Sequence, residues 1–210
     1  QSNFVWINSN LPDLKEKLGV ELPKYEVLQV GDHKKVALLG LMTEDPSLYR
    51  PGAFGGATIR PIVESTKELT HQLVKDQEVD LILPITHQGI AADRAMAQEL
   101  GPHIPLLMGG HDHEPYLETV HGCQIVKTGM DAHQAAVIDI RWHQEEETPT
   151  IEVQMLPTRD FPADPVIQER VEAHESILKE LGKAKLFRVQ DWVHVRNEQE
   201  DDPIFTTKDN

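Results

Sequence analysis

The sequence of 210 residues contains one cysteine, Cys123, which excludes an internal disulfide framework. It also lacks a basic excess: 20 lysines and arginines stand against 35 aspartates and glutamates, giving a formal net charge of −15. Because binding to a phosphate backbone needs a basic surface, this balance argues against a nucleic-acid partner. No apolar run approaches the roughly 18 residues that a membrane-spanning helix requires. These absences exclude a disulfide-stabilised scaffold, a nucleic-acid-binding protein and a membrane span.

The length is sufficient for one domain with a hydrophobic core and an additional segment. The hydrophobic content, 39%, is slightly low for a compact protein, and the last third of the sequence accounts for most of the deficit. The chain begins with Gln1 rather than Met, a few residues before the apolar run 4–7. We therefore expect it to be a piece of a longer protein, with processing or tag removal as the alternative.

Three histidines follow two apolar runs and form the most informative pattern in the sequence. His111 and His113 lie in the segment Gly-Gly-His-Asp-His, directly after the run 104–108, and His87 follows the run 79–85. The two preceding glycines allow backbone conformations closed to other residues and a close approach to a bound ion. Histidine is the commonest transition-metal ligand. The pattern therefore predicts a metal site at the ends of two neighbouring strands.

The order of the elements predicts an α/β fold. Strands are expected at 4–8, 36–42, 79–85 and 104–108, and helices at 59–75 and 90–100. Strands that alternate with helices through short connections form parallel sheets, in which sites gather at the carboxyl ends of the strands. The nearly continuous apolar character of these strands is typical of a sheet covered on both faces.

Shorter strands are expected after the histidines, in an antiparallel continuation or a second sheet. They span residues 116–120, 124–128, 135–142 and 150–156. A linker rich in helix breakers follows, and Asp164 is then expected to cap a helix that ends at Gly182. We thus predict a domain over residues 1–157, a linker and helix over 158–182, and a polar extension over 183–210.

The run from Asp80 to Gly89, then Asp93 and the segment 109–113, resembles the 5′-nucleotidase branch of the calcineurin-like metallophosphoesterases. The resemblance extends over nearly the whole chain, from Asn8 to the last residues. It implies the second half of a catalytic domain built as an αββα sandwich, followed by a connector helix. A C-terminal domain would begin where this sequence stops.

The resemblance also implies a function. Members of the family hold two divalent metal ions, for which zinc, manganese or iron suits mixed imidazole and carboxylate ligands, and hydrolyse phosphomonoesters with a metal-activated water. By this resemblance His87 and His111 would bind one ion and His113 the other, with a nucleotide as the expected substrate.

The sequence departs from the family pattern upstream of His87. The family's Asp-x-His, Gly-Asp and Gly-Asn-His motifs have no counterpart there, and Gly31-Asp32-His33 is interpreted as a hairpin turn. The family's catalytic histidine is also missing, so no catalytic residue is assigned. The missing half and the C-terminal domain would be supplied in cis or in trans, and we expect the isolated chain to be inactive.

Two carboxylates near the histidines are expected to support them rather than to bind metal. Asp93 is expected to cap or decorate the helix 90–100 or, alternatively, to face His87. Asp112 is expected to orient a neighbouring group. A second hypothesis for the whole chain is a non-catalytic interaction subunit that keeps the nucleotidase fold in a larger assembly. A third is a single-metal site built from the three histidines alone.

Overall fold

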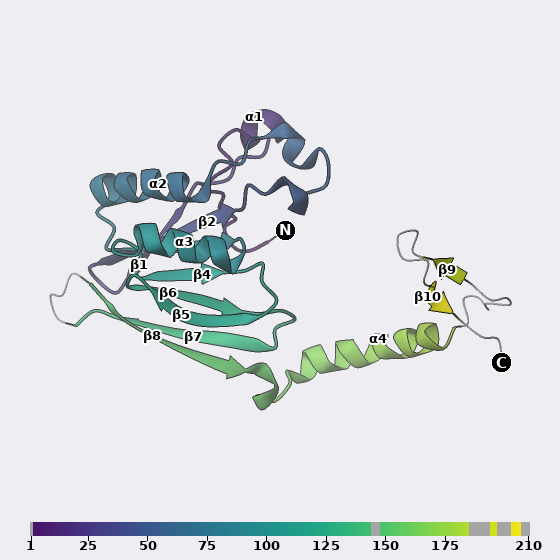
Figure 1. The fold of residues 1–210 in the computed structure, drawn as a ribbon. Coiled ribbons are helices and arrows are strands. Elements are labelled where there is room, and N and C mark those ends of the chain that lie inside the picture. The colour runs from purple at the N-terminus through teal and green to yellow at the C-terminus, as the bar shows by residue number, and fades with distance from the viewer. Residues whose placement is uncertain (1, 144–147, 185–193, 197–202, 207–210) are drawn as a thin grey trace. The chain divides into compact units, whose positions relative to one another are not determined.

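The structure, a computed structural model, describes residues 2–143, 148–184, 194–196 and 203–206. It divides into two units, Gln1–Phe161 and Pro162–Asn210, which are described separately (Figure 1). Most of the polar extension predicted over residues 183–210 lies outside the described residues. Within the described part of the chain, no helix is both long and apolar enough to cross a membrane.

A six-stranded sheet forms the centre of the first unit. Its strands, in the spatial order β1-β2-β3-β4-β6-β5, are β1 (Glu26–Val30), β2 (Lys34–Met42), β3 (Leu81–His87), β4 (Leu106–Gly109), β6 (Cys123–Thr128) and β5 (Pro115–Val120). The four central strands are parallel to one another, and β1 and β5 pair antiparallel at the two edges. The predicted α/β class with a mostly parallel sheet is confirmed.

Helices and a second sheet cover the two faces of this sheet. α2 (Ile62–Gln77) and α3 (Ile90–Leu100) lie on one face, and the antiparallel pair β7 (Gln134–Arg141) and β8 (Thr150–Pro157) lies on the other (Figure 1). The remaining elements of the unit are short: α1 (Leu14–Leu18) and the 3-10 turns Pro46–Leu48, Ala53–Gly56 and Thr158–Asp160. The unit thus contains three of the four layers of an αββα sandwich.

Alternating side chains of the central strands build two cores. Ala37, Ile82 and Leu107 pack in the cluster that contains the buried residues of α2 and α3. Val36, Leu81 and Leu106, one residue earlier in each strand, pack instead against β7 and β8. Because successive strand residues point to opposite faces, a sheet covered on both sides needs apolar residues at every position. This requirement explains the continuous apolar runs in the sequence.

The prediction of a strand over residues 4–8 is wrong. This segment has no strand structure, and the side chains of Phe4 and Trp6 are 62% and 60% exposed. Its backbone is tied to the sheet only beyond the apolar run, where the Ser9 amide donates to the Gly40 carbonyl over 2.9 Å. Four apolar residues in a row therefore do not form a strand here, because a strand requires a continuous ladder of hydrogen bonds.

The second unit consists of α4 (Pro165–Lys183) and the antiparallel pair β9 (His194–Arg196) and β10 (Pro203–Thr206). The Asp164 side chain accepts hydrogen bonds from the amides of Val166 and Ile167 over 2.9 and 3.0 Å, as expected of a helix cap. The prediction that Gly182 terminates this helix is wrong: Gly182 does not adopt the left-handed conformation of a helix cap, and α4 continues through it to Lys183.

Candidate metal centre at the ends of the parallel strands

His87 and His111 meet where two parallel strands end. His87 is the last residue of β3, and the pairing of Thr86 with Gly109 places the end of β4 beside it. The imidazole rings of His87 and His111 lie 5.4 Å apart between centroids, at 79° to each other. The expectation that these two side chains share one edge of the sheet is confirmed by this contact.

The glycine pair before His111 provides space for neighbouring side chains. Neither Gly109 nor Gly110 has a positive φ, whereas His111 itself adopts the left-handed region at φ 78°. A Cβ atom on Gly110 would lie 3.1 Å from Nδ1 of His87. The expectation that the glycines supply unusual backbone conformations is therefore corrected: they leave room for side chains, and a histidine carries the unusual backbone.

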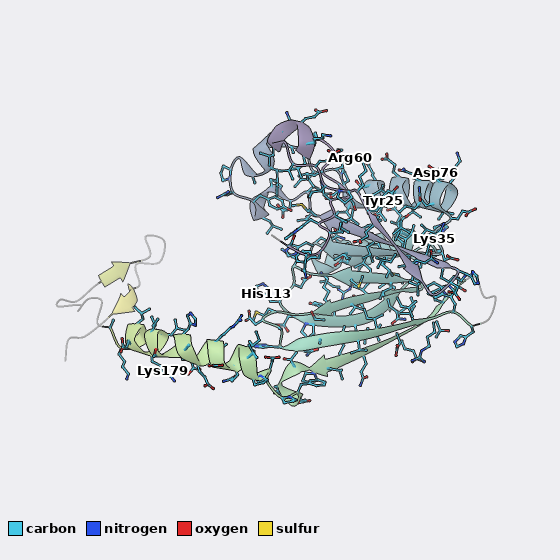
Figure 2. The ribbon with its side chains drawn as sticks, turned by 180° about the vertical axis from the view of Figure 1, so that it is seen from behind. Tyr25, Lys35, Arg60, Asp76, His113 and Lys179 are labelled. Atoms are coloured by element: carbon cyan, nitrogen blue, oxygen red, sulfur yellow. The ribbon has the colours of Figure 1, made fainter. Side chains whose placement is uncertain are left out.

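His113 lies two residues further along the same loop and is exposed. Figure 2 shows it at the end of the sheet opposite Lys35, which lies at the start of β2. Among the described residues, no three histidine, cysteine, aspartate or glutamate side chains are arranged to hold a metal ion. The assignment of His113 to a second metal therefore stays a prediction.

A buried lysine lies next to the histidines. Lys127, in β6, is 1% exposed, and its Nζ atom lies 2.7 Å from Oδ2 of Asp93 and also contacts the Asp112 carboxylate. The same ammonium donates to the carbonyls of Gln88 over 2.7 Å and Gly110 over 2.9 Å. We call these five groups the Lys127 network. The two carboxylates and one ammonium leave it with one formal negative charge.

Asp93 contacts the residues on both sides of His87. It lies in the first turn of α3, fully buried, where a carboxylate also complements the helix dipole. Its Oδ1 atom accepts hydrogen bonds from the Thr86 hydroxyl and the Gln88 side-chain amide, both over 2.8 Å. Of the two roles expected of Asp93, these contacts favour the one near His87 over the one on the helix. Among the hydrogen bonds that the structure describes, Asp93 makes none to the His87 ring but holds Thr86 and Gln88, the neighbours of His87 in the chain.

The electrostatics of the edge favour neutral imidazole and ionised carboxylate. Desolvation, followed by the charges of His111 and Lys127, lowers the pKa of His87 below its usual range. Burial alone would raise the pKa of Asp112, but the hydrogen bond and charge of Lys127 outweigh it and hold that pKa below its usual value. A neutral imidazole is the form that binds a metal ion.

The imidazole groups at this edge of the sheet are suited to form part of a metal site. Two adjacent imidazoles above a network with one net negative charge suit a divalent transition metal. A stable site needs further ligands, because zinc takes three or four protein groups. We therefore expect His87 and His111 to supply part of a coordination sphere, and this ligand role stays a prediction.

Two further features upstream of His87 have structural roles. Gly31-Asp32-His33 forms the turn between β1 and β2, as predicted. Asn10 is fully buried and uses its side chain to hold the backbone of Met42 and Arg60, over 2.7 to 3.0 Å. It is thus engaged in joining segments of the chain.

Two residues of the edge were missed by sequence reasoning. Lys127 lies inside a strand, and its only signal in the sequence is a cation directly after the apolar pair Ile125-Val126. Asp45 follows β2 at the same edge; hydrogen bonds from Ser47, and then the nearby His111, lower its pKa. Its signal is its position after a parallel strand, which becomes visible only when β2 is known to pair with β3.

Comparisons with known proteins identify relatives of this chain. No protein-family model matches the chain. It is 30% identical over 154 residues to a 5′-nucleotidase of Vibrio cholerae, a match that covers 67% of this chain and 27% of that protein. The chain thus spans about a quarter of the length of this curated relative.

Solved structures share the fold. A calcineurin-like phosphoesterase from Bacillus subtilis superposes with a TM-score of 0.68 at 15% identity, covering 87% of this chain and 65% of that one. A putative 5′-nucleotidase from Staphylococcus aureus gives a TM-score of 0.67 at 17% identity, covering 83% of this chain and 37% of that one. By sequence and by fold, this chain is a relative of the 5′-nucleotidase branch of the calcineurin-like metallophosphoesterases and corresponds to part of their catalytic domain.

Proposed function

We propose that this chain forms the second half of the catalytic domain of a metal-dependent phosphomonoesterase that acts on nucleotides. The observation that carries the proposal is the contact between His87 and His111 at the carboxyl edge of the parallel sheet. It occurs in a chain whose curated relatives include 5′-nucleotidases and apyrases. Ligand sites in open α/β sheets lie at this edge.

His87 and His111 would hold one divalent ion and His113 another, each zinc, manganese or iron. Divalent cations at such a site polarise a phosphoryl group and lower the pKa of a bound water. His87 presents a neutral nitrogen at pH 7, because its pKa is lowered. The net negative charge of the Lys127 network would attract a cation to the neighbouring imidazoles.

The isolated chain should not turn over substrate. Its described residues bring together two imidazoles, whereas a two-metal site needs bridging and terminal ligands on both ions. The missing ligands would come from an N-terminal half, and nucleotide specificity from a C-terminal domain, in the same or another chain. The absence of activity would then reflect an incomplete site.

Phosphatase activity on an aryl phosphate, with and without Mn²⁺, tests this proposal. The wild-type chain, His111→Ala and the control His71→Ala, an exposed residue of α2, should all be inactive alone. When the protein is extended upstream to include Asp-x-His, Gly-Asp and Gly-Asn-His motifs, Mn²⁺-dependent activity should appear in wild type and His71→Ala and fall at least 100-fold in His111→Ala.

Three outcomes would contradict parts of this expectation. Mn²⁺-dependent turnover by the chain alone, lost in His111→Ala, would show a complete site and refute only the expected inactivity. An upstream gene segment without these motifs, or an extended protein that stays inactive, would refute the hydrolase and favour the non-catalytic interaction subunit.

A further inference from the structure

A single buried ammonium joins the two loops that carry the candidate ligands. Gln88 directly follows His87, and Gly110 directly precedes His111. The Lys127 ammonium donates hydrogen bonds to both of their backbone carbonyls, over 2.7 and 2.9 Å. It also pairs with Asp112, which follows His111. A side chain that bonds to the neighbours of both histidines can fix the distance between the imidazoles without touching either.

The sequence around Lys127 makes room for this contact. A Cβ atom on Gly109 would lie 2.7 Å from Cε of Lys127 and 3.0 Å from Oδ2 of Asp93. Gly109 and Lys127 are also register partners in the parallel pair β4 and β6. A glycine at position 109 therefore leaves the space that the Lys127 side chain occupies.

The Lys127 network also determines which donors remain available. Asp112 lies between His111 and His113 in the chain, and a free carboxylate there would be a natural metal ligand. Its pairing with Lys127 occupies that carboxylate. The imidazoles, in contrast, carry no such partner among the contacts that the structure describes, and they remain the donors at the surface of the edge.

We propose that Lys127 is the positioning residue of this edge: its ammonium sets the spacing of His87 and His111 and keeps Asp112 away from the metal. The spacing is a property of the metal-free chain. The effect on metal choice rests on the proposed function.

The first measurement is the nuclear Overhauser effect between the His87 and His111 rings in the metal-free 210-residue chain. Lys127→Met alone would leave two carboxylates without their cation, so Asp93→Asn and Asp112→Asn are added so that no unpaired charge is left in the site. Gly109→Ala is a second variant, which keeps every charge but displaces the end of Lys127. The matched control is Lys34→Met with Asp80→Asn, which neutralises an ion pair at the start of β2 and β3.

We expect the ring-to-ring effect in wild type and the control, and its loss in the triple variant and in Gly109→Ala, with far-UV circular dichroism unchanged. Zn²⁺ affinity, measured by calorimetry, should fall at least tenfold in both variants, the range found when groups that orient metal ligands are removed. If the triple variant unfolds, Gly109→Ala decides the result.

The outcomes separate the two proposals. If the wild-type 210-residue chain binds no Zn²⁺, loss of the ring contact in the variants would still support the positioning role. The metal site would then be judged by the Mn²⁺-dependent activity of the extended protein. Retention of the ring contact and of Zn²⁺ affinity in Gly109→Ala and the triple variant would overturn the role of Lys127, whatever the activity of the complete protein.

Discussion

At the scale of the residue, burial decides which chemistry a side chain offers. Lys127 and Cys123 lie in the same strand, four residues apart, and both are almost completely covered. The Lys127 ammonium has four oxygen partners, which compensate for the burial of its charge. The thiol packs among apolar side chains and stays neutral.

Cys123 should be inert in the folded chain. Desolvation, with a contribution from Asp93, raises its pKa to about 12. At pH 8 roughly one thiol in ten thousand would be a thiolate, which is the reactive form. We expect no detectable reaction with an aryl disulfide reagent over an hour at pH 8, and complete reaction within minutes in 6 M guanidinium. Rapid labelling of the native chain would show that β6 opens or that the thiol is accessible.

At the scale of the element, the start of the parallel sheet has its own ion pair. Asp80 precedes β3 and accepts hydrogen bonds from the Lys34 ammonium over 2.9 Å and the Lys35 amide over 2.8 Å. Both residues lie at the start of β2, so one carboxylate joins the first residues of two neighbouring strands. The pair lies at the end of the strands opposite to the histidines.

Replacing Asp80 by Asn should weaken the chain in a pH-dependent way. Burial would raise the pKa of Asp80, but the Lys34 and Lys35 contacts outweigh it and lower that pKa below 3.8. A lowered pKa stabilises the folded state above pH 3.8, and this stability is lost as the pH falls through the folded-state pKa. We expect the substitution to reduce the free energy of unfolding by about 1 to 2 kcal/mol at pH 7.

Urea unfolding of wild type and Asp80→Asn at pH 7 and at pH 3 checks this expectation. The difference between the two proteins should shrink at pH 3, where the wild-type carboxylate begins to take up a proton. An equal difference at both pH values would mean that the side-chain geometry, rather than the charge, is responsible.

At the scale of the whole molecule, the first unit contains both hydrophobic clusters. Their buried residues and the apolar side chains packed on them all lie between residues 25 and 155. α4, in contrast, has no buried residue. The stability of the first unit should therefore come from its own layers.

Truncation after Phe161 should leave the fold of the first unit intact. We expect residues 1–161 to unfold thermally within about 3 °C of the full chain, because burial of apolar surface dominates the folding free energy and this surface is retained. The measurement is differential scanning calorimetry of both proteins. A fall of 10 °C or more would show that the second unit covers apolar surface of the first.

Much of the fold is predictable from local patterns. The runs at 36–42, 79–85 and 104–108 and the helix at 90–100 appear close to their predicted bounds, because each combines a clear period with a defined end. The segment 4–8 has the same apolar character but no ladder, and a strand depends on its neighbour as much as on its own residues.

The candidate site, like the fold, was predictable only in part from local sequence patterns. The sequence by itself determined that His87 and His111 follow buried strands and so lie at one edge of a parallel sheet, since the direction of such strands fixes where their ends meet. Only the tertiary structure decided that the rings come within 5.4 Å and that Lys127 joins their loops. Such contacts depend on register and depth between strands that are distant in sequence, which no local period encodes.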